Sequence, residues 1–199
     1  HRRLVLPELG APGVSAHEVH RATGFHVEYG PVRATDLPEF LRTRVATPEM
    51  RTVTFDLKER IVLIPVELRH ILPYALLGTI ALLLAGGLLP ASAFLAAILA
   101  GTVLFPALLP YLPTDDFSTR GFILGVCIAV PFAAWAAVGI RAPVLVQIAS
   151  IFAILLSVPA ITAYLSLNFT GSTPFASRTG VRKEIFRYIP AMAAAGAAG

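Results

Sequence analysis

The hydrophobic and polar positions divide the chain into a mixed N-terminal stretch and a long apolar block. From Ile71 to Leu167, formal charges occur only at Asp115, Asp116, Arg120 and Arg141. A bilayer core of about 30 Å needs roughly 20 apolar residues per helix, and no water is present inside it to satisfy free backbone groups. The block therefore predicts an all-α polytopic membrane domain, which we place at residues 69–167.

Four membrane spans fit the block. They are expected at Ile71–Leu89, Ala91–Leu109, Gly121–Ile140 and Pro143–Leu167. Small residues recur at every fourth position in two of them, namely Ala93, Ala97 and Gly101 in the second and Gly121, Gly125, Ala129, Ala133 and Ala137 in the third. Because small residues let helices approach closely in a bilayer, we expect these faces to form helix–helix contacts.

The N-terminal stretch alternates between strand and helix patterns. Leu4–Leu6 is a short apolar run, a glycine-containing turn follows at Gly10–Gly13, and Ser15–Glu18 is a capping box that starts a helix. This helix is expected to end at Gly24, after which Phe25–Tyr29 alternates as a strand does.

A second turn and helix follow that strand. The turn is expected at Gly30–Ala34, Thr35 is the expected cap, and residues 36–44 carry apolar side chains at helical spacing. Alternating strands and helices imply parallel strands, as at the edge of a doubly wound sheet, whose ligands bind at the carboxyl ends of the strands. Those ends are the loops Gly10–Gly13 and Gly30–Arg33.

Two β-rich runs lead into the apolar block. Thr52–Phe55 and Ile61–Val66 are separated by a charged segment, which predicts a hairpin or a pair of edge strands. Pro65 favours an edge because it cannot donate a hydrogen bond to a neighbouring strand. The resulting α/β domain, residues 1–68, is small for an independent core, so we expect further strands before His1.

Composition and charge agree with a membrane protein. Hydrophobic residues make up 56% of the 199 residues, and the mean hydropathy is +0.73. The net charge of +4 does not indicate nucleic acid, because the basic residues lie just outside the apolar block, at Arg60, Arg69, Arg178, Arg182, Lys183 and Arg187. Such flanks mark the cytoplasmic side, so we expect the cytoplasmic (inner) membrane, with residues 168–199 as a cytoplasmic connector and the start of a truncated fifth helix.

Polar residues inside the block are few. No Asp, Glu, Lys or Arg lies at mid-membrane depth, which argues against a proton-coupled transporter or an ion channel. Gln147, Ser150 and Ser157 share a helix face, where they either line a substrate path or form interhelical hydrogen bonds. Cys127 lies in an apolar run and is expected to be a buried small hydrophobe.

The histidines of the N-terminal stretch are candidate metal ligands. His17 and His20 share a helix face, and His26 is close in sequence. Because no cysteine or carboxylate set completes a ligand group, solvent-facing histidines are the favoured interpretation.

Two stretches carry information beyond the hydrophobic pattern. The first comprises Leu6–Val19 (LPELGAPGVSAHEV), Gly24–Phe25, Tyr29–Pro38 (YGPVRATDLP) and Ala46–Arg51 (ATPEMR), and the second comprises Asn168–Ser177 (NFTGSTPFAS) and Gly180–Ile185 (GVRKEI). The first resembles the later half of the corrinoid-binding domain of a known family, the membrane-bound corrinoid protein of microbial mercury methylation, and the second resembles the segment after a late membrane helix in the same family. The family is related to the corrinoid iron–sulfur protein of the acetyl-CoA pathway.

The resemblance implies a cofactor and a reaction. Proteins of this family hold a cobalamin-type corrinoid in a Rossmann-like sheet, take a methyl group from a methyl-folate-dependent donor and pass it from cobalt to Hg(II), with a ferredoxin-like iron–sulfur partner supplying electrons. By this resemblance, residues 1–68 are the C-terminal part of such a domain, and the residues near the corrinoid or its nucleotide tail are Gly10, Ala11, Pro12, Gly13, Gly30, Pro31 and Val32. The alternative is that these residues only form tight turns.

The family's diagnostic motif does not occur in this chain. That motif is an Asn-x-Trp-Cys-Ala-Ala-Gly-Lys cap helix whose cysteine faces cobalt, whereas Trp135 and Cys127 lie apart in the apolar block. We therefore assign no catalytic residue and no metal ligand, expect the motif before His1, and expect the chain to be an inactive fragment by itself. The alternatives are a related corrinoid protein of the CO dehydrogenase/acetyl-CoA synthase pathway and a small membrane transporter or anchor.

Overall fold

The computed structural model describes residues 2–53, 56–172 and 178–199 and divides the chain into two compact units. The first unit is His1–Thr54 and the second is Phe55–Gly199. The boundary expected at residue 68 therefore falls inside the second unit, within its first helix.

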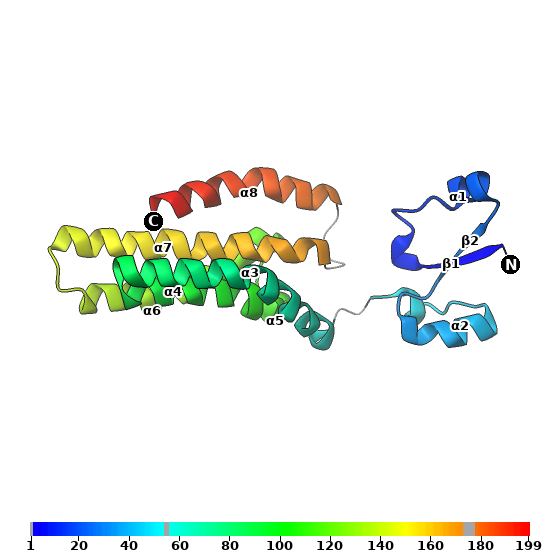
Figure 1. Ribbon diagram of the computed structural model, residues 1–199, viewed down its shortest axis with the longest axis horizontal. Helices are drawn as coiled ribbons and strands as arrows, with labels where there is room; N and C mark the ends of the chain where they lie inside the picture. The colour runs from blue at the N-terminus through cyan, green and yellow to red at the C-terminus, as the bar shows by residue number, and fades with distance from the viewer. Residues whose placement is uncertain (1, 54–55, 173–177) are drawn as a thin grey trace. The chain divides into compact units, whose positions relative to one another are not determined.

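The first unit is a small α/β arrangement around two parallel strands (Figure 1). Its strands and α-helices are β1 (Arg3–Pro7), α1 (Ala16–Thr23), β2 (His26–Gly30) and α2 (Leu37–Thr43), and its 3₁₀ turns are Glu8–Gly10, Ala34–Asp36 and Glu49–Arg51. The strands pair in register from Arg3 opposite His26 to Pro7 opposite Gly30. The predicted strand–helix–strand unit with parallel strands is confirmed, and within the described residues the sheet has two strands.

Local signals set the ends of α1. The Ser15 hydroxyl accepts a hydrogen bond from the Glu18 N–H at 3.3 Å, which confirms the predicted cap. Gly24 ends the helix with φ of +73°, a conformation that glycine adopts without steric cost. The cap predicted at Thr35 is wrong, because Thr35 lies in a 3₁₀ turn and α2 starts after Asp36 without a side-chain cap.

The core of the first unit forms around Phe40 of α2, next to Gly30 at the end of β2. Phe40 is 2% exposed and Met50 is also buried. A Cβ added at Gly30 would lie 3.0 Å from Val5 Cγ1 and 3.1 Å from the Phe40 ring. Gly30 is therefore needed for close packing between the sheet and α2.

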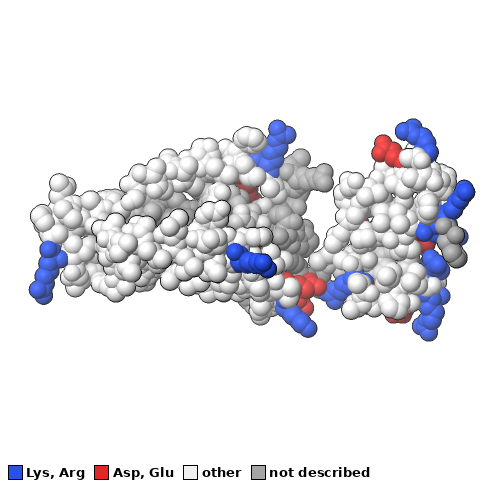
Figure 2. All heavy atoms as spheres, in the orientation of Figure 1, with Lys and Arg blue, Asp and Glu red and all other residues white. Residues whose placement is uncertain are grey.

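The second unit is all-α. Its elements are α3 (Leu57–Gly86), α4 (Leu88–Leu99), a π-helical segment (Ala100–Leu104), α5 (Phe105–Leu108), α6 (Phe117–Gly139), α7 (Val144–Leu167) and α8 (Arg178–Ala198), with 3₁₀ turns at Leu109–Tyr111 and Asn168–Ser172. Four helical stretches are long and apolar enough to cross a membrane: Leu57–Gly86, Leu88–Tyr111, Phe117–Gly139 and Val144–Thr170. The predicted all-α membrane domain is thus supported, and most of this unit's surface in Figure 2 carries no charge.

The predicted hairpin before the membrane domain is wrong. Ile61–Val66 lies within α3, and Thr52 and Val53 are not in a strand, while Thr54 and Phe55 lie outside the described residues. The Asp56 carboxylate accepts a hydrogen bond from the Glu59 N–H at 3.0 Å and so caps the start of α3. This cap and the apolar helix that follows outweigh the β propensity of the run.

Close contact between α6 and α7 depends on glycine. A Cβ at Gly121 would lie 2.8 Å from Ala163 Cα, and one at Gly125 would lie 2.5 Å from Pro159 Cα. Ala129 and Ala133 continue this buried face, as predicted, whereas Ala137 is exposed. Cys127 was expected to be buried but is exposed on the bundle surface.

The π-helical segment precedes a proline. Pro106 has no N–H and, in a regular α-helix, its ring would collide with the carbonyl of Thr102. The segment Ala100–Leu104 widens the backbone just before it, with the Phe105 N–H bonded to the Ala100 carbonyl. Thr102 is buried there and donates its hydroxyl hydrogen to the Ile98 carbonyl at 2.7 Å.

Helix α8 runs back along α7, antiparallel to it (Figure 1). Its Glu184 contacts the start of α6, whereas a Cβ at Gly199 would lie 2.6 Å from the Ala153 carbonyl oxygen. A helix is therefore present in the segment 168–199, where the start of a fifth helix is expected, and it runs from Arg178 to Ala198.

Candidate functional site

The two predicted binding loops leave the same edge of the sheet. Pro7 and Gly30 are register partners at the carboxyl ends of β1 and β2. The loop after β1 continues through a 3₁₀ turn to Gly13, and the Tyr29 hydroxyl donates a hydrogen bond to the Val14 carbonyl at the end of that loop. The shared edge expected from the strand–helix alternation is therefore present.

A hollow of about 250 Å³ opens at this edge. Its lining is mostly apolar and consists of Val5, Leu6, Pro7, Pro31, Val32, Arg33, Ala34 and Leu37. Pro31 and Val32 are predicted site residues and lie in this wall, whereas Gly10, Ala11, Pro12 and Gly13 do not line it. Complete ligand pockets enclose about 300–1,000 Å³, so the hollow contacts only part of a larger ligand.

Most backbone donors of the predicted site are used within the chain. The Ala11 N–H donates to the Glu8 carbonyl at 3.0 Å, the Gly13 N–H to the Gly10 carbonyl at 3.0 Å, and the Val32 N–H to the Met50 carbonyl at 2.8 Å. The two prolines have no N–H. The edge therefore offers a ligand mainly side chains.

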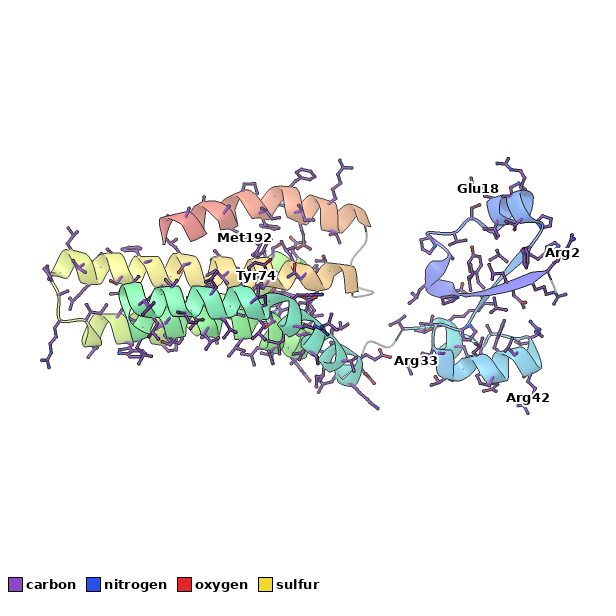
Figure 3. All side chains as sticks on the ribbon, in the orientation of Figure 1. Arg2, Glu18, Arg33, Arg42, Tyr74 and Met192 are labelled. Carbon is purple, nitrogen blue, oxygen red and sulfur yellow. The ribbon has the colours of Figure 1, made fainter. Side chains whose placement is uncertain are left out.

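A polar hollow of about 480 Å³ shares Arg33 with the apolar one. Arg33 is labelled in Figure 3, and the other lining residues are Asp36, Glu39, Thr47, Glu49, Met50 and Thr52. Three carboxylates face one guanidinium here, so the hollow disfavours a phosphate group.

The histidines of the first unit form no metal site among the described residues. The rings of His20 and His26 stack at 4.2 Å, and His20 Nδ1 lies 3.3 Å from the Phe25 carbonyl oxygen. The described part of the chain holds no group of three or more His, Cys, Asp or Glu side chains that could bind a metal. His17, His20 and His26 are all exposed.

The Glu184 side chain on α8 is a buried polar group of the membrane unit with several hydrogen bonds. Glu184 is 8% exposed. Its carboxylate accepts hydrogen bonds from the Phe117 N–H at 3.2 Å, from the Ser118 N–H at 3.0 Å and from the Ser118 hydroxyl at 3.0 Å. These are unpaired donors at the start of α6, where the helix dipole also favours negative charge. Glu184 therefore caps α6 from another helix.

Arg60 caps the C-terminal end of α5, as Glu184 caps the N-terminal end of α6. It is 7% exposed, and its guanidinium donates to the carbonyls of Pro106 and Ala107, both at 3.1 Å. These carbonyls lack helical partners because the helix ends there. The contact ties the start of α3 to the end of the second membrane-spanning stretch.

A second contact holds α8 beside Glu184. The Tyr188 hydroxyl donates to the Asp116 carboxylate at 2.8 Å. This hydrogen bond, with partial burial and the charge of Asp116, raises the pKa of Tyr188 above its usual value of 10.0. Asp116 immediately precedes α6, so both side chains of α8 bind the same helix start.

An aromatic cluster lies at the same end of the bundle. The ring of Phe105 is 5.9 Å from the rings of both Phe117 and Phe169, and all three side chains are fully buried. Phe105 adjoins the carbonyls bound by Arg60, and Phe117 carries an amide bound by Glu184. The polar contacts therefore surround an apolar centre that excludes water.

Among the described residues, the polar face predicted on the last span forms no hydrogen bond to another helix. Ser150 and Ser157 donate to carbonyls of their own helix, those of Val146 and Ala153, and Gln147 bonds the Ile140 carbonyl in the preceding loop. Thr162 instead bonds across to the Ala97 carbonyl of α4 at 3.3 Å.

Sequence reasoning missed Glu184 and Arg60 as bonded groups. The signal for Glu184 is that it is the one acidic residue of the sequence from 178 to 199, in a segment of four basic residues next to an apolar run. Arg60 was interpreted only as a topology signal.

Comparisons of the chain with protein-family models, with curated proteins and with solved structures find no match. Its function is therefore inferred from its own residues.

Proposed function

We propose that the chain is the membrane-anchored part of a corrinoid-dependent methyltransferase of the mercury-methylation type. The observation that carries the proposal is the parallel pairing of β1 and β2, which brings the loops Gly10–Gly13 and Gly30–Val32 to one sheet edge. These loops lie in the stretch that resembles the corrinoid domain of that family. A membrane unit follows the same stretch directly.

The residues at the sheet edge fit one side of a large flat ligand. Pro7, Pro31 and Val32 offer small apolar surfaces, and Pro31 is buried. The bonded amides and the acidic hollow do not favour a phosphate-bearing nucleotide tail at this position. The proposed contact is therefore with the apolar rim of a corrin ring.

In this proposal the chain's own residues position the corrinoid and enclose one side of it. A corrinoid, when bound, supplies the transfer of a methyl group from cobalt. Pro31 and Val32 form an apolar wall that excludes water beside it, and Gly30 keeps this wall close to Phe40. No side chain of the chain is assigned to the reacting atoms, and a methyl-folate-dependent donor and a ferredoxin-like iron–sulfur protein are the proposed partners.

The proposed orientation places the first unit in the cytoplasm of a cell with an inner membrane. The contacts of Arg60 and Glu184 bring the start of α3, the end of α5 and the start of α6 to one end of the bundle. Arg69 and the basic residues of α8 belong to the same flanks. An excess of Lys and Arg at one end favours the cytoplasmic side.

Methyl transfer in membranes from cells that express the complete gene tests this function. Membranes given methylcobalamin and Hg(II) under reducing conditions are expected to form methylmercury, and membranes from cells without the gene are the control. Formation of acetyl-CoA from a methyl donor, CO and CoA, without methylmercury, would instead assign the protein to the acetyl-CoA pathway. Substrate flux in liposomes without either product would indicate a transporter and contradict the proposal.

A further inference from the structure

An apolar groove of about 340 Å³ lies between α3 and α8. Its floor comes from α4 and α7, and its lining residues are Ile71, Tyr74, Ala75, Phe94, Ile98, Ala160, Ile161, Tyr164, Leu165, Ile189, Met192, Ala193 and Gly196. Figure 3 labels one residue from each wall, Tyr74 on α3 and Met192 on α8. The groove therefore lies at the depth of the membrane-spanning helices.

Helix α8 is loosely packed on its other flank as well. A second apolar cavity of about 370 Å³ lies between α8 and α6 and includes Phe122, Ala191 and Ala195 in its lining. The apolar half of α8 thus lies on α7 between two apolar hollows, while Glu184 and Tyr188 fix its other half.

We propose that the groove between α3 and α8 is a binding site for an anionic phospholipid. One acyl chain occupies the groove, and the phosphate lies at Arg182, in the basic N-terminal half of α8.

The apolar lining decides the character of the occupant. Water in a cavity needs two to four polar partners, and this lining offers almost none. A further transmembrane helix with its side chains would be about 10–12 Å wide. The groove is bounded at its sides by α3 and α8 and at its floor by α4 and α7, which favours a narrower occupant. An acyl chain is apolar, narrow and abundant in the surrounding bilayer.

Charge at one end of the groove decides the headgroup. Arg182 lies seven residues before Ile189, two helical turns along the same face of α8. The Glu184 carboxylate is buried against amides of α6 and does not neutralise this surface. On α3, Glu67 and Arg69 offset one another, so the excess positive charge comes from α8. Basic residues next to a membrane-spanning segment attract anionic lipids.

Lipid retention measured by native mass spectrometry tests the site. The complete protein is purified in detergent, incubated with phosphatidylglycerol or phosphatidylcholine of equal chain length, and released from micelles. The wild type is expected to retain phosphatidylglycerol at least fivefold more than phosphatidylcholine. Equal retention of the two lipids, or retention of neither, would overturn the proposal.

Two variants separate the acyl and headgroup contacts. Ala193→Phe fills the groove and is expected to abolish retention of both lipids, whereas Val138→Phe, at an 88% exposed position on α6, is the matched control and retains them. The double variant R182Q/K183Q is expected to lose the preference for phosphatidylglycerol. Unchanged retention in Ala193→Phe, or an unchanged preference in the double variant, would contradict the site.

A fluorescence measurement keeps the test independent of a folding defect. Tyr74→Trp combined with Trp135→Phe leaves one tryptophan within residues 1–199, at the groove. Phosphatidylglycerol brominated on its acyl chain is expected to quench this tryptophan at lower mole fraction than brominated phosphatidylcholine does. Identical quenching curves for the two lipids would overturn the proposal.

Discussion

The carboxylate of Glu184 on α8 binds Ser118 on α6 twice, accepting from its N–H and from its hydroxyl, each at 3.0 Å. The two residues are far apart in the sequence, and both are buried. Through this pair, α8 supplies the cap that the first turn of α6 lacks from its own neighbour, Asp116. The start of a membrane-spanning helix and the position of α8 therefore depend on one side chain.

Replacement of Glu184 by alanine is expected to destabilise the membrane unit. Hydrogen bonds to charged groups contribute about 1.5–3 kcal/mol, and their loss leaves buried N–H groups without an acceptor. The predicted result is a lower unfolding midpoint in detergent and faster proteolysis between α7 and α8. Glu184→Gln, which keeps one acceptor oxygen, should have an unfolding midpoint and a proteolysis rate between those of the wild type and Glu184→Ala.

Lys183→Ala is the matched control for Glu184. Lys183 is adjacent in sequence but exposed, so its removal should leave the midpoint and the proteolysis rate near wild type. Equal effects of the two alanine variants would mean that Glu184 does not cap α6.

Replacement of Arg60 by alanine is expected to loosen α3 from the end of α5. The carbonyls of Pro106 and Ala107 would lose their donor, at a cost of about 1.5–3 kcal/mol. Arg60→Lys keeps the charge but not the planar fork of donors, so it should recover only part of the loss. Thermal unfolding of the variants, with exposed Arg69→Ala as control, measures this difference.

The docking of α8 is expected to weaken at strongly alkaline pH. The hydrogen bond to Asp116 raises the pKa of Tyr188 in the folded protein, so its stabilisation is complete below the unfolded value of 10.0 and is lost as the pH rises through the raised value. Absorbance at the tyrosinate band measures the ionisation of Tyr188, and proteolysis of α8 measures the weakening of its docking. Tyr188→Phe should remove this component of the pH dependence, and Asp116→Asn should lower the pKa of Tyr188.

The contact between α6 and α7 is expected not to tolerate a methyl group at Gly121. A Cβ there would lie 2.7 Å from Ser166 Cβ and 2.8 Å from Ala163 Cα, and overpacking of this kind costs about 1–3 kcal/mol. Gly196→Ala is the control, because a Cβ at that helical glycine meets nothing within 4 Å. A lower unfolding midpoint for Gly121→Ala than for Gly196→Ala is the predicted outcome, and equal midpoints would contradict it.

The elements that sequence predicts here are those with local signals. The cap at Ser15, the left-handed Gly24 and the long apolar runs each act over a few residues, and each is present in the structure. The strand predicted at Ile61–Val66 fails because β-branched residues also occur in membrane-entering helices once a cap such as Asp56 starts them.

The polar contacts of the membrane unit could not be predicted in the same way. Arg60 and its acceptors are more than forty positions apart, and Glu184 and Ser118 are 66 apart. No local pattern specifies such pairs, because they arise only when the helices pack. At the sheet edge the shared position of the two loops was predictable from strand order, whereas the use of their amides within the chain was not.

Retention of a corrinoid tests the central proposal most directly. The complete gene product is purified from membranes of cells supplied with cobalamin, and its visible absorption and cobalt content are measured. The proposal predicts a corrinoid spectrum with about one cobalt per protein, reduced by Val32→Glu, which places a charge in the apolar hollow. Protein that is folded, inserted in the membrane and free of corrinoid and cobalt would contradict it.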